Sequence, residues 1–232
     1  MPRASAIIIG NEILNGKVQD ANTQTLARVL FECGVALKCV ETIPDHTETI
    51  VETVRKHSAT YDLVFTSGGI GPTHDDITYD GVAKAFGQNL ALHAETVRRY
   101  REFHGKEPNE ARKRMALLPE NAEVFFNDGL WVPTVYLRPV YVLAGIPELF
   151  TQMLEGIRHR FTYQSFERAL IYTDRLEGDI AAELEQVQQQ FSDVEIGSYP
   201  QKPGSDHRVM LSVEGANAEH VRQAADLIEK FV

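Results

Sequence analysis

The chain has 232 residues, 43% of them hydrophobic, and a formal net charge of −10 at pH 7. This apolar content is enough for a sizeable core, and the length suits one large domain or a medium domain followed by a small one. The strongly acidic balance argues against nucleic acid as a partner, because proteins bind phosphate backbones through clustered Lys and Arg side chains.

The first 160 residues alternate between short apolar runs and segments with helical spacing. Strands are predicted at residues 4–10, 35–43, 61–65, 123–126, 134–138 and 140–143. Helices are predicted to follow caps at Asn22 and Asp45, and to span residues 78–86, 93–104, 109–117 and 147–161. This alternation predicts right-handed βαβ crossovers, and therefore an α/β fold in three layers with a mostly parallel sheet.

The pattern changes after residue 163. Strands are predicted at residues 169–172, 194–199 and 208–213, and helices at residues 178–191 and 216–231. This βαββα order predicts a small C-terminal α+β domain with a KH-like arrangement, so we expect domains at residues 1–162 and 166–232. The small unit lacks a G-x-x-G clamp between helix and strand and is acidic, which argues against RNA binding.

The sequence gives no sign of a membrane segment or of disulfide chemistry. No stretch approaches the roughly 20 apolar residues of a membrane span, and the apolar run near the N-terminus is too short for a secretory signal. Cys33 and Cys39 lie in apolar segments and are expected to be small, reduced hydrophobic residues. We therefore expect a cytoplasmic protein that does not bind a membrane.

Three loops that follow predicted strands are rich in polar residues and glycine. They are residues 10–16, which continue to Asp20 and Asn22, residues 66–76, and residues 144–148. In an open parallel sheet, ligands bind beyond the carboxyl ends of the strands, where the strand order reverses. If the sheet begins with the order 2-1-3, the first two loops are neighbours at that point.

The second loop combines glycines, hydroxyls and carboxylates. Positive φ angles and close approach of a ligand are possible at Gly68, Gly69 and Gly71. The hydroxyls of Ser67 and Thr73 add hydrogen-bond donors. A predicted helix N-terminus follows, which favours a phosphate. Asp75 and Asp76 would repel that phosphate unless a divalent cation lay between them. The loop therefore predicts joint binding of a phosphate and of Mg²⁺ or Mn²⁺.

Purely structural explanations exist for several of these residues. Glycine-rich loops also serve as plain turns, and Asp75, Asp76 and Asp45 are each suited to capping the helix that follows. His74 is expected to be a surface loop residue rather than a metal ligand. We expect a functional role for Glu12, because a carboxylate directly after a buried strand has no helix face to occupy.

The same motifs resemble those of the molybdopterin-binding-like domain family. They are Ile9–Gly16 with Asp20 and Asn22, then Thr66–Thr78, and then Ala144–Glu148. In particular, the sequence is similar to the N-terminal part of the competence/damage-inducible CinA proteins and to the matching domain of eukaryotic FAD synthases. The resemblance covers about residues 4–161 and includes Asn109–Pro119. The tail, with Ile196–Pro200, is similar to the small second domain of the CinA type.

The resemblance implies a metal-dependent pyrophosphatase that acts on ADP-ribose, FAD or a similar nucleotide diphosphate, and a homo-oligomer, either a dimer or a trimer. Glu12, Asp75 and Asp76 are the expected catalytic residues and ligands of a divalent metal, namely Mg²⁺, Mn²⁺ or Co²⁺, with K⁺ as a further candidate cation. The expected substrate-binding residues are Asn11, Asp20, Asn22, Asp45, Ser67, Gly68, Gly69, Gly71, Thr73, Thr78, Gly145, Pro147 and Glu148.

Two departures from the family pattern leave other functions open. Asn11 stands where the family usually has Asp, so a metal bound there would lose one charged ligand. The sequence also carries neither the amidohydrolase domain of many CinA proteins nor the adenylyltransferase domain of FAD synthases. The alternatives are molybdopterin binding and adenylylation in molybdenum-cofactor synthesis, and a catalytically degenerate module that only binds a nucleotide.

Overall fold

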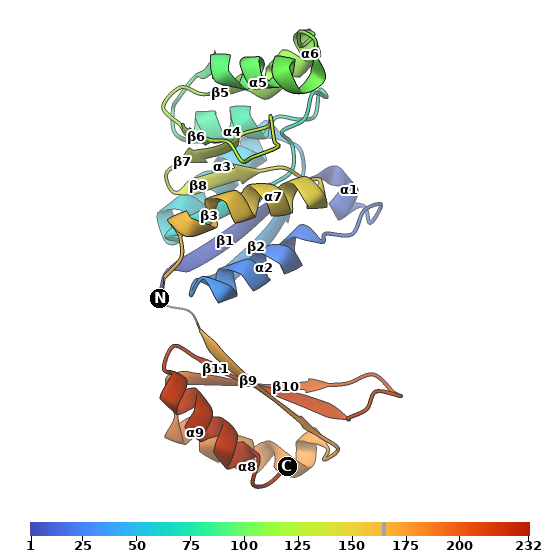
Figure 1. Ribbon diagram of the computed structural model, residues 1–232, viewed down its shortest axis with the longest axis vertical. Coiled ribbons are helices and arrows are strands. Elements are labelled where there is room, and N and C mark those ends of the chain that lie inside the picture. Colours follow the sequence, from blue (N-terminus) through green and yellow to red (C-terminus); the bar gives the residue numbers. More distant parts are fainter. Residues whose placement is uncertain (164–165) are drawn as a thin grey trace. The chain divides into compact units, whose positions relative to one another are not determined.

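The computed structural model describes residues 1–163 and 166–232. These residues form two compact units, which Figure 1 shows in sequence colours. The first unit comprises Met1–Phe31 and Val35–Thr162, and the second comprises Glu32–Gly34 and Tyr163–Val232. Among the described residues, no helix combines the length and the apolar character that crossing a membrane requires.

The first unit is built on a six-stranded sheet with the order β2-β1-β3-β8-β7-β6. The strands are β1 (Arg3–Ile9), β2 (Ala36–Ile43), β3 (Leu63–Ser67), β6 (Glu123–Phe125), β7 (Thr134–Leu137) and β8 (Val140–Leu143). The pairs that join β2, β1, β3 and β8 are parallel, whereas β7 and β6 run antiparallel to their neighbours. The predicted order 2-1-3 and the mostly parallel sheet are confirmed.

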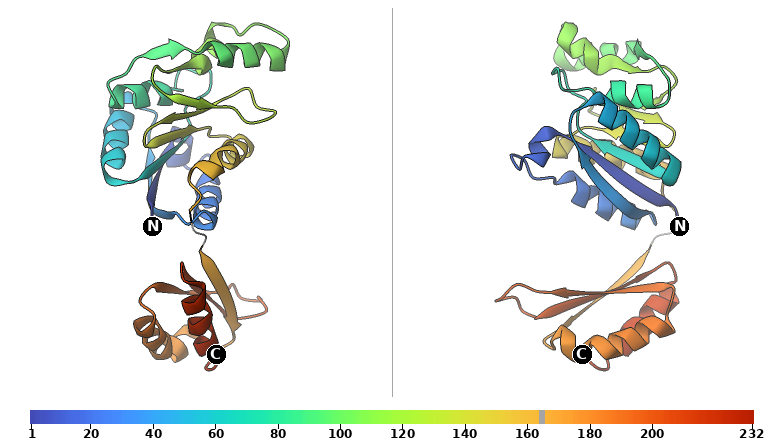
Figure 2. Two further views of the ribbon diagram at one scale, coloured as in Figure 1. Left: turned by 60° about the vertical axis from the view of Figure 1, so that its left-hand side comes forward. Right: turned by 180° about the vertical axis from the view of Figure 1, so that it is seen from behind.

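Helices cover both faces of this sheet, which explains why its central strands are continuous apolar runs. Every residue of β3 and β8 is buried, as are the last six of the seven residues of β1. Helices α2 (Asn22–Glu32) and α7 (Pro147–Ile157) lie on one face, and α3 (Thr47–Thr60) and α4 (Thr78–Ala85) lie on the other, as Figure 2 shows. The three-layer α/β architecture is therefore confirmed.

Residues 90–119 form a smaller substructure beside α4. It contains β4 (Leu90–Leu92), α5 (Ala94–His104), α6 (Glu110–Lys113), the 3-10 turn η1 (Arg114–Ala116) and β5 (Leu117–Pro119). The helix predicted at residues 109–117 is shorter than expected, because Leu117 already pairs with Leu92 in the antiparallel β4–β5 ladder. A further 3-10 turn, η2 (Arg158–Arg160), follows α7.

Two predicted helix caps are wrong. Asn22 is the first residue inside α2, and its backbone N–H donates instead to Asp20 Oδ1 at 3.0 Å. The cap of α3 is His46, whose side chain makes no capping hydrogen bond, so Asp45 lies one residue too early. Both errors have one physical reason: Asn and Asp favour the loop before a helix as well as the cap itself. The side chains of Asn22 and Asp45 are thereby released for other contacts.

The second unit has the predicted βαββα order. It comprises β9 (Glu167–Thr173), α8 (Glu177–Gln190), β10 (Val194–Pro200), β11 (Val209–Gly215) and α9 (Ala218–Ile228). The antiparallel sheet has the order β10-β11-β9, and α8 and α9 cover one of its faces (Figure 1). Ile171, Leu211 and Val213 point from the strands into the core between sheet and helices.

Candidate functional site

Asn22 joins the three loops that the sequence singled out. Its side chain is 5% exposed, and its Nδ2 donates to Ser67 Oγ and to the Gly145 carbonyl oxygen, at 2.8 Å each. Asn22 follows β1 in the chain, Ser67 ends β3 and Gly145 follows β8, so one amide connects three neighbouring strands at their carboxyl ends. Asn22 Oδ1 has no hydrogen-bond partner among the described residues.

A small hollow lies beside this amide at the carboxyl ends of the strands. Seven of the predicted site residues line it: Glu12, Asp20, Asn22, Ser67, Gly68, Gly145 and Pro147. Its volume is about 50 Å³, well below the roughly 300–1,000 Å³ of pockets that enclose drug-sized ligands. The hollow can therefore enclose a few atoms, and a larger ligand would extend from it over the surrounding loops.

The glycine-rich loop needs glycine because of its own packing. Gly68 and Gly69 have φ angles of 107° and 67°. A Cβ at Gly68 would lie 2.1 Å from the Ile9 carbonyl oxygen, and one at Gly69 would lie 2.3 Å from Thr78 Oγ1. Thr78 is fully buried, and its hydroxyl donates to the Gly68 carbonyl at 2.8 Å. Thr78 thus holds the loop in place, a different role from the substrate contact that was predicted for it.

The acidic end of the loop converges on Thr73. The Thr73 N–H donates to Asp76 Oδ2 at 2.8 Å, and Thr73 Oγ1 lies 2.5 Å from both Asp75 Oδ1 and Asp76 Oδ2. A hydroxyl donates only one hydrogen, so the two carboxylates compete for the Thr73 hydroxyl hydrogen, and only Asp76 also accepts the Thr73 N–H. Neither of them caps α4, since its cap is Ile77 and no side chain bonds there. The hydrogen bond from Thr73 is the main cause that lowers the pKa of Asp75.

Asp45, which follows β2, contacts the first loop and is close enough to the second to be affected by its charge. Its Oδ2 accepts the backbone N–H of Asn11 at 2.8 Å. Burial is the main cause that raises the pKa of Asp45 above its ordinary value, and the negative charges of Glu12 and Asp75 raise the pKa further. The two loops therefore contribute to one acidic region, as the predicted strand order requires.

The raised pKa of Asp45 predicts that Asp45→Asn increases thermal stability near neutral pH. An ionised group whose folded-state pKa is raised destabilises the fold at every pH above that pKa. The gain should disappear as the pH falls below about 3.9, the ordinary aspartate pKa, where the group is protonated in both states. Scanning calorimetry across this range measures the difference in melting temperature. A loss of stability that is the same at every pH would contradict the prediction.

The predicted three-carboxylate metal site is not preformed. Within the described ranges, no group of three or more His, Cys, Asp or Glu side chains is placed to hold a metal ion. Asp75 and Asp76 meet at Thr73, whereas the Glu12 carboxylate lies against Gly10, where an added Cβ would be 2.6 Å from Glu12 Oε1. The donor chemistry fits a hard cation that takes its other ligands from water and phosphate, as Mg²⁺ commonly does.

The remaining predicted residues lie around this region. A Cβ at Gly71 would lie 2.6 Å from Asp76 Oδ2, so this glycine admits the carboxylate. Pro147 is the first residue of α7, and Glu148 is exposed in its first turn, where it bonds to no other described side chain. His74 is exposed on the loop, as expected, with its Nδ1 3.9 Å from Asp75 Oδ1.

One residue at the loop escaped the sequence prediction. The Arg114 guanidinium donates from Nη2 to the carbonyl oxygen of Pro72, 42 residues earlier in the chain. The segment Arg112-Lys113-Arg114 is basic in an acidic protein, which is the signal that could have indicated a contact with an acidic loop. Periodicity predicted only a helix at residues 109–117, and the family resemblance included this segment without assigning a role to Arg114.

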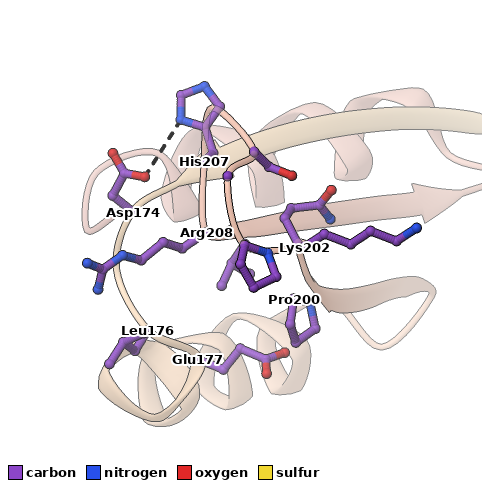
Figure 3. A pocket seen from close by; sticks show the side chains of 12 residues that line it. Asp174, Leu176, Glu177, Pro200, Lys202, His207 and Arg208 are labelled. Carbon is purple, nitrogen blue, oxygen red and sulfur yellow. Dashed lines mark ion pairs between the residues drawn. The ribbon is translucent and has the colours of Figure 1, made fainter.

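A larger hollow, of about 540 Å³, lies in the second unit. Figure 3 shows its lining, drawn from the β10–β11 connection and the start of α8. Lys202 and Arg208 point in opposite directions, and His207 is paired with Asp174. The cations do not converge as a phosphate would require, so the loops around Asn22 and Thr73 remain the candidate site.

Comparisons with known proteins identify the family of each part of the chain. The profile of a family described as a probable molybdopterin binding domain matches residues 5–162, and that of the FAD synthase middle domain matches residues 165–232. A crystal structure of the protein CinA from Thermoplasma acidophilum is similar, with a TM-score of 0.65 and 27% sequence identity. The similarity covers 69% of this chain and 98% of that chain.

Two relatives differ in how much of their length the chain covers. A protein of Archaeoglobus fulgidus is 34% identical over 97% of this chain and 96% of its own length. A probable FAD synthase of Caenorhabditis elegans is 30% identical over 93% of this chain, which spans 47% of that relative. The chain thus belongs to the CinA-type family of molybdopterin-binding-like domains, followed by a domain of the FAD synthase middle type.

Proposed function

We propose that the protein is a divalent-metal-dependent pyrophosphatase that hydrolyses the diphosphate of a nucleotide derivative such as ADP-ribose or FAD. The observation that carries this proposal is the convergence of Asp75 and Asp76 on the single hydroxyl of Thr73. Two carboxylates that share one hydrogen form a strongly negative point, and a divalent cation compensates such a point best. The similarity to a probable FAD synthase supports a nucleotide diphosphate as substrate.

The glycine-rich loop would bind one phosphate through its backbone. The N–H groups of Gly69 and Gly71 donate to no acceptor in the part of the chain that the structure describes, and α4 begins a few residues later. Free N–H groups in a turn of this kind, together with a helix N-terminus, attract a phosphate. Asn22 Oδ1, which also has no partner among the described residues, is available for a ligand hydroxyl.

A metal held by Asp75 and Asp76 would supply charge neutralisation and an activated water. Asp45 would be the carboxylate that accepts a proton, because burial raises its pKa above the ordinary aspartate value. Glu12 and Asp20, which line the hollow, would orient the sugar or the second phosphate. Homo-oligomer formation and a cytoplasmic location stay predictions.

A substrate panel tests the proposal. The protein is incubated with ADP-ribose, FAD, NAD and diadenosine compounds, each with Mg²⁺, Mn²⁺ or Co²⁺, and the products are separated by chromatography. Hydrolysis of the diphosphate should release AMP together with the second monophosphate, and only when a metal is present. If all compounds stay intact while calorimetry detects their binding, the protein is a nucleotide-binding module. That outcome is favoured by Asn11, which stands where the family usually has Asp.

Position 11 gives a second prediction. The Asn11 backbone is fixed by Asp45, while its side chain makes no hydrogen bond to a described residue. If this side chain reaches the cation, Asn11→Asp adds a charged ligand and should lower the metal concentration for half-maximal rate by about tenfold, or about 1.4 kcal/mol. A metal titration of the initial rate at saturating dinucleotide measures this change. Superimposable curves for the two proteins would exclude position 11 as a metal ligand.

A further inference from the structure

The peptide unit between Pro72 and Thr73 is held from both sides. The Pro72 carbonyl accepts a hydrogen bond from Arg114, and the Thr73 N–H of the same peptide donates to Asp76 Oδ2 at 2.8 Å. In a planar trans peptide the carbonyl oxygen and the N–H point in opposite directions. Arg114 and Asp76 therefore hold the two ends of one rigid plane.

This plane sets the geometry of the acidic end of the loop. Thr73 follows the plane directly, and its Oγ1 lies 2.5 Å from a carboxylate oxygen of Asp75 and of Asp76. If the peptide rotated, the Thr73 N–H would turn away from Asp76 Oδ2, and Asp76 would lose one of its two contacts with Thr73. Proline at position 72 fixes φ but leaves ψ free, so the orientation of the plane depends on what its carbonyl and N–H contact.

Arg114 reaches the loop from a separate part of the fold. It opens the 3-10 turn η1, which is held in place by the pairing of β5 with β4. The side chain is exposed, and among the described residues only Pro72 accepts a hydrogen bond from it. Its printed contact is therefore with the loop backbone, not with a carboxylate.

We infer that Arg114 is a positioning residue for the metal site: by fixing the Pro72–Thr73 peptide, it holds Asp75 and Asp76 together for a divalent cation. This inference rests on the proposed function for its catalytic consequence. A competing role is purely electrostatic, in which the positive charge of Arg114 only opposes the negative charge of the site. The two roles predict opposite effects on metal use.

The test compares Arg114→Met with Arg112→Met in the full-length protein. Methionine keeps the length of the side chain but removes the charge and the donors. Arg112 lies two residues earlier, is exposed, and its side chain bonds to no described residue, so it is the matched control. Hydrogen exchange is measured at the amides of Thr73 and Asp76, and the metal concentration for half-maximal release of AMP is measured separately.

Arg114→Met removes the charged hydrogen bond to the Pro72 carbonyl, which is stronger than a neutral one. The peptide should then rotate more freely, and the Thr73 amide should exchange about tenfold faster or more. The metal concentration for half-maximal rate should rise by a similar factor, and Arg112→Met should change neither. A lower metal requirement in Arg114→Met would assign Arg114 the electrostatic role and overturn the inference. Unchanged exchange at Thr73 would also overturn it.

The exchange measurement separates this inference from the proposed function. If the wild-type protein hydrolyses none of the dinucleotides, the pyrophosphatase proposal fails. The exchange of Thr73 in Arg114→Met still shows whether the guanidinium fixes the peptide. Arg114→Lys gives a finer comparison, since it keeps the charge and one donor and should restore part of the protection at Thr73.

Discussion

Asp76→Asn is expected to reduce turnover of the dinucleotide by at least about a hundredfold, comparable to removing one preorganised group that stabilises charge in a transition state. The amide keeps an oxygen that can accept the Thr73 N–H, so the loop should retain its shape. What it loses is the negative charge that, with Asp75, would hold the cation. The melting temperature should change by only a few degrees.

Asp80→Asn is the matched control for this experiment. Asp80 lies four residues later in the first turn of α4, and its carboxylate pairs with Lys84 at 2.6 Å. Losing that surface pair should cost about 0.3–0.5 kcal/mol of stability and leave turnover unchanged. The rates of both variants are measured at saturating metal. Full activity in Asp76→Asn would show that Asp76 is not a ligand of the proposed metal.

Gly69→Ala is expected to weaken dinucleotide binding by more than about tenfold and to lower stability. The left-handed backbone at φ 67° costs a residue with a side chain about 1–2 kcal/mol. In addition, the new Cβ would lie 2.3 Å from Thr78 Oγ1, whose hydroxyl holds the Gly68 carbonyl. The loop must move to relieve this contact. Its backbone N–H groups would then no longer point toward one bound phosphate.

Gly87→Ala separates the cost of the left-handed backbone from the effect of the contact with Thr78. Gly87 has a nearly identical φ of 65°, but an added Cβ meets nothing within 4 Å. This variant should lose only the stability that the left-handed backbone costs a residue with a side chain. Its dinucleotide affinity should equal that of the wild type. Calorimetric titration with a slowly hydrolysed dinucleotide measures the affinities, and thermal unfolding measures the stabilities. Equal affinities for Gly69→Ala and the wild type would reduce the loop to a plain turn.

The fold was predictable because its central strands carry strong local signals. The apolar run at residues 4–10 and the wholly buried Leu63–Ser67 indicate strands covered on both faces. The reversal of strand order between β1 and β3 then places the first two loops together. Short elements with weak signals were missed, namely α1 (Asn11–Leu14), β4 and β5, which are three or four residues long and depend on tertiary contacts.

The roles of individual site residues were harder to predict. Asn22 was expected to cap a helix, but its amide joins two other loops, which depends on the positions of β3 and β8. Thr78 was expected to contact substrate, but its side chain is buried and its hydroxyl donates to the Gly68 carbonyl oxygen. The contact of Arg114 spans 42 residues, and local periodicity carries no information about such a partner. Motifs therefore indicated where the site lies, and only the structure showed what each side chain contacts.

The most direct test of the central claim is the initial rate of AMP release from ADP-ribose as a function of Mn²⁺ concentration. The structure places Asp75 and Asp76 on Thr73 in the glycine-rich loop that we propose binds phosphate, so we predict no release in the presence of a chelator and a saturable rise with Mn²⁺. Release of AMP that is unaffected by the chelator, or its absence at every Mn²⁺ concentration while ADP-ribose binds, would contradict a metal-dependent pyrophosphatase.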